Sequence, residues 1–150
     1  MASVVLRLKG RAVSRGLGVG EALVLSKPIS LFGGLDPKTG RVVERAHPLC
    51  GASVKGRVLV FPHSKGSTVG SWVLYELSMR GLAPAAIVNV EADPVVAAGC
   101  VVARIPLVDR LEADPVTLLK TGWLVRVVAD RSGGIVEVLE TGRSTGEGRP

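Results

Sequence analysis

The residues best suited to chemistry lie in one short stretch of the chain. They are Lys65-Gly66-Ser67-Thr68-Val69-Gly70-Ser71. The stretch follows an apolar run at residues 58–62 and precedes residues 72–77, whose pattern is typical of a helix. A strand, a glycine-rich turn and a helix start bring backbone N–H groups and a serine hydroxyl together, where the helix dipole favours an anionic ligand. A nucleotide-binding P-loop places lysine after the second glycine, so the order found here argues against one.

The composition indicates one domain with an aliphatic core and no nucleic-acid partner. A chain of 150 residues buries roughly two-thirds of its surface on folding. Of these residues 47% are hydrophobic but only 3% aromatic, so Val, Leu and Ala must build the core. The net charge of +6 comes from scattered basic residues with few aromatic rings to stack on bases. We expect a solvated basic surface, or one matched to an acidic partner or substrate.

Neither a metal site nor a membrane segment is expected in this chain. Cys50 and Cys100 form no Cys-x-x-Cys pair, and two thiols cannot ligate an iron–sulfur cluster alone. We expect both to be small buried hydrophobic residues in a reducing compartment, with any cluster on another chain. The apolar runs are shorter than the roughly 18 residues of a membrane helix, and the N-terminus has no secretory signal pattern. A cytoplasmic protein is expected.

The expected strands change in character along the chain. The first third, with strands and long loops, indicates a small barrel, whereas the remainder alternates strands and helices, so the fold class is α/β. The expected strands cover residues 4–8, 21–25, 58–61, 85–90, 101–105, 123–129 and 135–139. Gly133-Gly134 is expected to form the hairpin turn between the last two strands. Residues 1–140 are expected to form one domain and residues 141–150 a disordered tail.

Two helices are predicted from local signals. Residues 69–77 have helical spacing, and Gly81 is placed to end that helix. Asp93 is the expected N-cap of a second, short helix that begins at Pro94 and runs through residue 98.

Four motifs resemble those of one known family. In chain order they are Gly33-Gly34-Leu35-Asp36-Pro37-Lys38-Thr39-Gly40, His47-Pro48, Gly66-Ser67-Thr68-Val69-Gly70-Ser71 and Ala83-Pro84-Ala85-Ala86-Ile87-Val88. Their order is similar to that in the small subunit of aconitase X, most closely its archaeal form. The resemblance covers roughly residues 6–139.

The resemblance implies a swivelling β/β/α domain, β-barrel-like with flanking helices, that closes over a large subunit in a heterodimer or larger assembly. The large subunit is implied to hold an iron–sulfur cluster on its own cysteines. Together the chains are expected to act as a hydro-lyase that dehydrates (R)-5-phosphomevalonate to trans-anhydromevalonate 5-phosphate in the archaeal mevalonate pathway. Ser67 is implied to be the base. The main aconitase branch has an arginine two residues beyond the base, whereas Val69 stands here, so carboxylate binding must differ from that branch.

The implied reaction is chemically consistent with the motif. Dehydration of a β-hydroxy acid removes a proton from C2 and expels hydroxide from C3, a poor leaving group that Lewis-acidic iron stabilises. Backbone N–H groups can stabilise the charge that builds on the carboxylate, each by about 2.7–4 kcal/mol by analogy with oxyanion holes. Serine is a weak base unless its surroundings favour the alkoxide. The helix dipole, Lys65 and the cluster are candidates for that role, and the sequence does not rank them.

Each candidate residue also has an ordinary structural interpretation. Without the resemblance, Ser67 would be a helix N-cap; if it is the base, Thr68 or Ser71 is the alternative cap, and Ser71 the alternative catalytic serine. Gly66 and Gly70 are expected to permit close backbone approach. The predicted substrate-binding residues are Gly66, Thr68, Ser71, Lys65 and His63.

Three further features stay open at this stage. Residues 33–40 form a plain turn or a loop that meets the partner subunit or lines the mouth of the site. His47 is a loop histidine or has a role at the substrate or the interface, and His63 either touches the site or is an exposed loop residue. Lys65 is either the cation that meets an anionic substrate or a solvated side chain.

Two rival functions are also open. A hydroxyproline dehydratase subunit of the same type would share the fold and the serine. A stand-alone anion-binding module would use the same turn without catalysis, and it would purify without a cluster-bearing partner.

Overall fold

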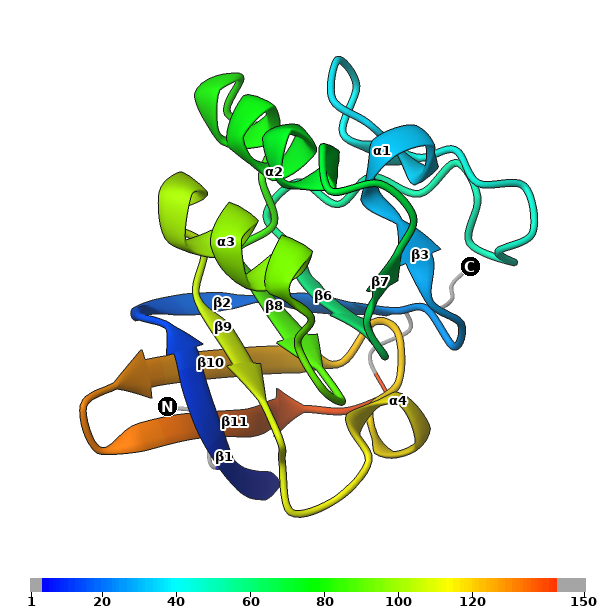
Figure 1. Cartoon of the computed structure of the whole chain (residues 1–150). Coiled ribbons are helices and arrows are strands. Elements are labelled where there is room, and N and C mark those ends of the chain that lie inside the picture. The colour runs from blue at the N-terminus through cyan, green and yellow to red at the C-terminus, as the bar shows by residue number, and fades with distance from the viewer. Residues whose placement is uncertain (1–3, 143–150) are drawn as a thin grey trace.

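The computed structural model describes residues 4–142, and seven of the strands in that range close into a barrel (Figure 1). The barrel order is β1–β11–β10–β2–β6–β8–β9, and it closes because β1 pairs with both β11 and β9. The strands are β1 (Leu6–Ser14), β2 (Gly16–Val24), β6 (Val58–Phe61), β8 (Ala86–Asn89), β9 (Leu107–Asp109), β10 (Leu124–Asp130) and β11 (Gly133–Glu140). The expected α/β class with a small barrel is confirmed. Most of the predicted tail, from residue 143 onward, lies outside the described residues.

One half of the barrel is parallel and is covered by helices. Strands β2, β6, β8 and β9 run parallel to one another, while β1, β10 and β11 pair antiparallel. Figure 1 shows α2 (Gly70–Met79) and α3 (Pro94–Ala103) lying side by side above the parallel strands. Parallel strands require crossover connections, which these helices supply.

Four short strands and two short helices complete the fold. Strand β3 (Ile29–Ser30) pairs in parallel with β7 (Ser64–Lys65), and β4 (Leu35–Asp36) pairs with β5 (Arg41–Val42) in a small hairpin. The short helices are α1 (Leu31–Gly34) and α4 (Pro115–Leu118). Strand β7 leads directly into the turn that carries Ser67, the base expected from the sequence.

The core divides into two apolar clusters on either side of the parallel strands. Alternate residues of β6 show this: Val58 and Val60 point into the barrel, whereas Leu59 and Phe61 pack toward the helices. All four are fully buried. A strand buried on both faces needs a continuous apolar run, which is why this segment could be read from the sequence.

The second helix follows its predicted start but not its predicted end. The Asp93 carboxylate accepts the N–H groups of Val95 and Val96 at 3.2 and 3.4 Å, which confirms the N-cap. The helix then continues to Ala103 and ends where Arg104 adopts a left-handed conformation with φ 61°. The strand predicted over residues 101–105 is therefore wrong, since its first three residues are helical and β9 begins only at Leu107.

The hairpin prediction at Gly133-Gly134 is also wrong. These glycines already pair with Asp130 and Ala129, so the turn residues are Arg131 and Ser132. By contrast Gly81, with φ 71°, does follow the end of α2 as expected.

Candidate functional site

The Ser67 turn is built on the end of a strand and the start of a helix. Strand β7 ends at Lys65, Gly66 bends the chain with φ 93°, and α2 begins at Gly70. A Cβ atom on Gly66 would lie 3.0 Å from the Ser30 hydroxyl oxygen, and its φ is one that side-chain-bearing residues rarely adopt. Gly66 therefore permits both the bend and the close approach of β3.

The Ser67 hydroxyl faces outward and makes one local hydrogen bond. Its Oγ accepts the N–H of Val69 at 3.2 Å, and its carbonyl accepts the N–H of Gly70 at 3.0 Å. The residue in the N-cap position of α2 is Val69, which makes no side-chain cap. Ser71 donates to the carbonyl of Thr68 at 3.3 Å, so the alternative in which Thr68 or Ser71 caps the helix is wrong.

The backbone N–H groups without an acceptor belong to the turn that precedes α2, not to its first turn. The N–H groups of Gly70, Ser71 and Trp72 donate to the carbonyls of Ser67, Thr68 and Val69 at 3.0, 3.5 and 3.0 Å. Within residues 4–142, no acceptor takes the N–H groups of Gly66, Ser67 and Thr68. Successive free N–H groups in a bent turn suit an anion. The donors for an anion, which were expected from the first turn of the helix, are therefore those of the preceding turn.

Lys65 is paired within this chain. Its ammonium Nζ lies 3.0 Å from Glu44 Oε2, and 53% of its side chain remains exposed. Glu44 had no recognisable motif in the sequence, and it is the clearest site residue that sequence reasoning missed. The only sequence signal is its spacing three residues before His47.

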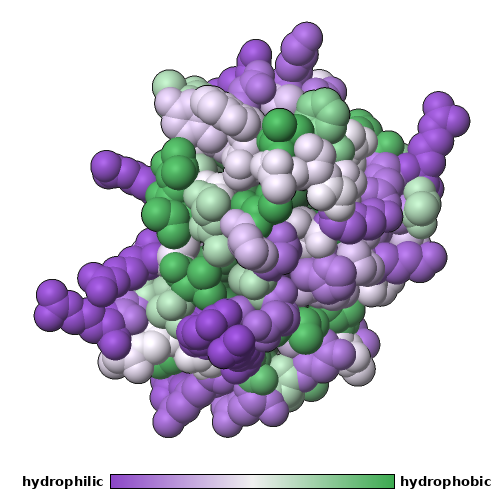
Figure 2. All heavy atoms as spheres, viewed as in Figure 1, coloured by the Kyte–Doolittle hydropathy of each residue, from purple (hydrophilic) through white to green (hydrophobic). Residues whose placement is uncertain are grey.

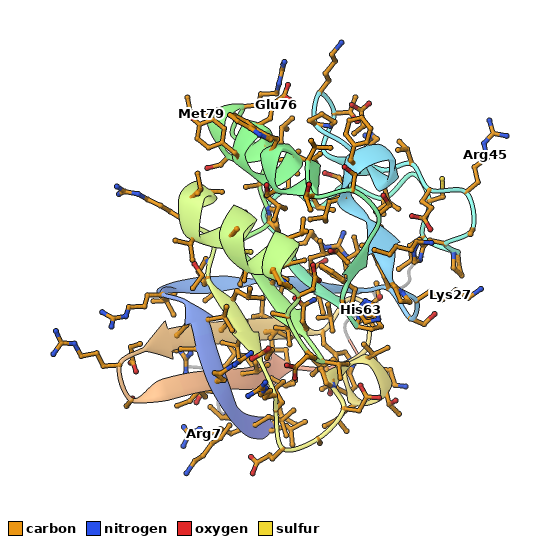
Figure 3. All side chains as sticks on the ribbon, viewed as in Figure 1. Arg7, Lys27, Arg45, His63, Glu76 and Met79 are labelled. Carbon is orange, nitrogen blue, oxygen red and sulfur yellow. The ribbon has the colours of Figure 1, made fainter. Side chains whose placement is uncertain are left out.

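The two histidines both lie in loops, but one is buried and the other is exposed. The His47 side chain is fully buried, with Nε2 3.3 Å from the Pro28 carbonyl and 3.5 Å from Glu44 Oε2. Its Nδ1 has no partner among the described residues. His47 therefore lies in a loop, as its default interpretation predicted, with a buried ring. His63 is exposed, its Nδ1 lies 2.8 Å from the carbonyl of Ser64, and Figure 3 shows it well below α2, whose far end carries Glu76 and Met79.

A second carboxylate holds the other residue of β7. Asp93 accepts the backbone N–H and the hydroxyl of Ser64 at 2.7 and 2.6 Å. Burial alone would raise the pKa of Asp93, but the hydrogen bonds from Ser64 and from the first turn of α3 outweigh it and lower the pKa. The sequence indicated Asp93 only as a helix cap.

Apolar side chains flank the turn on its outer side. Phe32, Val69 and Trp72 are 61%, 45% and 67% exposed. They border a cavity of about 680 Å³ between residues 32–43 and α2. A second cavity of about 470 Å³ lies between α2 and α3 and also reaches Trp72. In Figure 2, green hydrophobic spheres lie over these helices among paler ones.

The segment of residues 33–40 is mainly a turn. Asp36 and Gly40 close it, because the Asp36 carbonyl accepts the Gly40 N–H at 2.8 Å and its carboxylate accepts the Lys38 N–H at 2.9 Å. Its first part nevertheless lines the larger cavity through Gly33 and Leu35. The turn interpretation therefore applies to residues 36–40, and a role of the segment at the partner subunit or at the mouth of the site stays a prediction.

The described residues do not form a site for an iron–sulfur cluster. Cys50 is exposed, which corrects the expectation that both cysteines are buried, while Cys100 lies in the core of α3. Burial, with a smaller contribution from Asp93, raises the pKa of the Cys100 thiol and makes it a poor ligand. Residues 4–142 contain no group of three or more His, Cys, Asp or Glu side chains able to hold a metal ion. In the same range, the helices are too short or too polar to cross a membrane.

Comparison with known proteins assigns the family. The family model of the aconitase X swivel domain matches residues 7–138. The chain belongs to this family.

Similar proteins come from archaea. One is the phosphomevalonate dehydratase small subunit of Methanosarcina acetivorans, 53% identical over 91% of this chain and 94% of that protein. The protein of the same name from Thermococcus kodakarensis is 47% identical over 91% of this chain and 99% of that protein.

Solved structures agree with the fold. The crystal structure of Thermococcus kodakaraensis aconitase X in its holo form has a TM-score of 0.84 and 46% identity, over 90% of this chain and 99% of that chain. A solution NMR structure of a UPF0107 protein has a TM-score of 0.78 and 44% identity, over 90% and 100%. The swivelling β/β/α domain expected from the sequence is confirmed.

Proposed function

We propose that this chain is the small subunit of a hydro-lyase that dehydrates (R)-5-phosphomevalonate to trans-anhydromevalonate 5-phosphate. The names of its archaeal relatives support the enzyme class and the subunit role. The observation that carries the proposal is the Ser67 turn, which presents an exposed hydroxyl beside three free backbone N–H groups. A hydroxyproline dehydratase subunit is the alternative that the substrate assay separates.

Ser67 is proposed to accept the proton from C2 of the substrate. The N–H of Val69 points at its Oγ, and a donor to that oxygen favours the alkoxide over the hydroxyl. The N–H groups of Gly66 and Thr68 are proposed to donate to the carboxylate as charge builds on it. Because Lys65 is already paired with Glu44, we assign the substrate's negative groups to the turn amides and to the partner.

The large subunit is proposed to cover the face around Ser67. The two cavities described above reach Val69 and Ser71 but are not lined by Ser67, which fits a site that a surface of the partner completes. Phe32, Val69 and Trp72 give that surface apolar anchors of the kind that dominate subunit interfaces. The iron–sulfur cluster expected for the family is proposed to lie on the large subunit, and the free cysteines fit a reducing cytoplasm.

The test is turnover by the reconstituted complex of Ser67→Ala, with Ser71→Ala as the matched serine variant. Loss of a general base typically reduces kcat by about 10²–10⁴, and this loss is expected for Ser67→Ala alone. Phosphomevalonate and hydroxyproline are assayed in parallel under anaerobic conditions. Near-normal turnover by Ser67→Ala, or loss only in Ser71→Ala, contradicts the assignment.

The partner surface is tested separately by binding. Trp72→Ser should weaken association with the large subunit by about 2 kcal/mol or more, as for a buried aromatic anchor. Met79→Ser is the matched control, since Met79 is 69% exposed near the other end of α2. Equal affinities for the two variants would place the partner on another face.

A further inference from the structure

Glu44 contacts two segments that are distant from it in the sequence, at Ser30 and Lys65, and also the nearby His47. Its Oε1 accepts the backbone N–H of Ser30 at 3.1 Å. Its Oε2 lies 3.0 Å from the Lys65 ammonium and 3.5 Å from Nε2 of the buried His47. The side chain is 18% exposed, so this carboxylate is held in place on several sides.

The charge on Glu44 is maintained by these contacts. Burial alone would raise the pKa of Glu44, but the Ser30 N–H, the Lys65 ammonium and the His47 ring outweigh burial and lower the pKa. The carboxylate is therefore ionised at neutral pH. It pairs with the ammonium of Lys65, the last residue of β7, two residues before Ser67.

The same contacts hold the strand that carries the turn. Ser30 of β3 and Lys65 of β7 are register partners, so the Glu44 carboxylate contacts both strands at the same pair of residues. At the neighbouring pair, Ser64 of β7 donates its backbone N–H and its hydroxyl to Asp93. Each residue of β7 is thus bound by its own carboxylate, and Gly66 then packs against Ser30. Little freedom remains in the segment that places Ser67.

We infer that Glu44 is a positioning residue for Ser67, acting through the Lys65 ammonium and the Ser30 backbone. This inference rests on the proposed function, because it concerns the placement of the proposed base. Loss of the Glu44 charge releases Lys65 and loosens the turn. A reacting group displaced by about 1 Å can lose about 10² in rate.

The experiment uses the reconstituted complex with Glu44→Gln, which keeps the shape and an acceptor for Ser30 but removes the charge. The matched control is Glu112→Gln, whose carboxylate accepts the Lys9 N–H at 2.9 Å on the barrel side. For Glu44→Gln we expect kcat to fall about tenfold to a hundredfold with KM nearly unchanged and the melting temperature close to that of the control. Hydrogen exchange at the Val69 and Gly70 amides should become several-fold faster.

Lys65→Met tests whether Glu44 acts through the ammonium. In a Lys65→Met background, Glu44→Gln should have a much smaller effect on kcat, since the shared interaction is already gone. Multiplicative effects of the two changes would overturn the route through Lys65.

The exchange measurement separates this inference from the proposed function. Unchanged exchange at Val69 and Gly70 in Glu44→Gln overturns the positioning role, whatever the turnover. Faster exchange with undiminished kcat also overturns it, because the turn would then be loosened without consequence. If Ser67→Ala alone retains activity, the proposed base is wrong even where the exchange result holds.

Discussion

Asp93 ties α3 to the strand that carries Ser67, and its loss should destabilise the fold more than loss of an ordinary helix cap. The chain contains a matched comparison, because both Asp93 and Asp114 precede a proline and cap a helix. Asp114 accepts only from its own helix, at 3.0 Å from the Val116 N–H and 3.0 Å from the Thr117 hydroxyl. Asp93 additionally holds the backbone and hydroxyl of Ser64. Alanine variants at the two positions therefore separate the free energy of the helix cap from that of the Asp93–Ser64 hydrogen bonds.

The magnitude follows from the bonds that each change removes. Loss of an aspartate cap costs typically about 1 kcal/mol, which is the whole expectation for Asp114→Ala. Asp93→Ala also leaves the buried Ser64 with two unpaired polar groups, and about 1 kcal/mol for each gives a total of about 3 kcal/mol. The expected difference between the variants is thus about 2 kcal/mol.

Urea denaturation of the small subunit measures the free energies of unfolding of both variants. A Ser64→Ala variant measures the part of the Asp93 effect that comes from the Ser64 hydroxyl. Acid titration adds a second test. Because the pKa of Asp93 is lowered by folding, its stabilisation is present above the unfolded pKa of about 4 and is lost as pH falls through the folded value. The stability of Asp93→Ala should therefore fall less than that of the wild type below about pH 4. Equal losses for Asp93→Ala and Asp114→Ala would refute the reasoning.

Two further predictions concern the helix layer. Gly99→Val should lower the free energy of unfolding by about 1–3 kcal/mol through overpacking, because a Cβ there would lie 2.8 Å from Leu74 Cδ1 and 3.1 Å from the backbone of Ser71; no change in a urea titration would contradict this packing. A thiol reagent should modify only Cys50 in the native chain, since Cys100 is buried with a raised pKa, and a Cys50→Ser variant that still reacts before unfolding would contradict it.

The elements that could be read from the sequence are those with local causes. Strand β6 was found within its observed bounds because a run buried on both faces has to be apolar throughout. The start of α3 was found because Asp93 and Pro94 satisfy the free N–H groups of a first turn without help from elsewhere.

The errors arose where a distant contact decides the conformation. Val101 and Val102 have the composition of a strand, yet they extend α3 because its inner face packs against α2 and the core. Gly134 is not a turn residue; it is a position where the backbone of β11 comes close to Val108, since a Cβ there would lie 2.7 Å from that side chain. Neither the packing of α3 nor the closure of the barrel is encoded locally.

The same division runs through the candidate site. The bend at Gly66 could be predicted because its positive φ favours glycine, and Ser67 follows it directly in the motif. The role of Glu44 could not be predicted from its neighbour His47 alone, because its other two partners, Ser30 and Lys65, come from segments that meet only when β3 and β7 pair. A base on an exposed turn needs its position fixed by the structure around it, and the support we propose for Ser67 is the Glu44 carboxylate, which lies in another segment of the chain. The proposed base can thus be identified from the local motif, whereas its position depends on the tertiary fold.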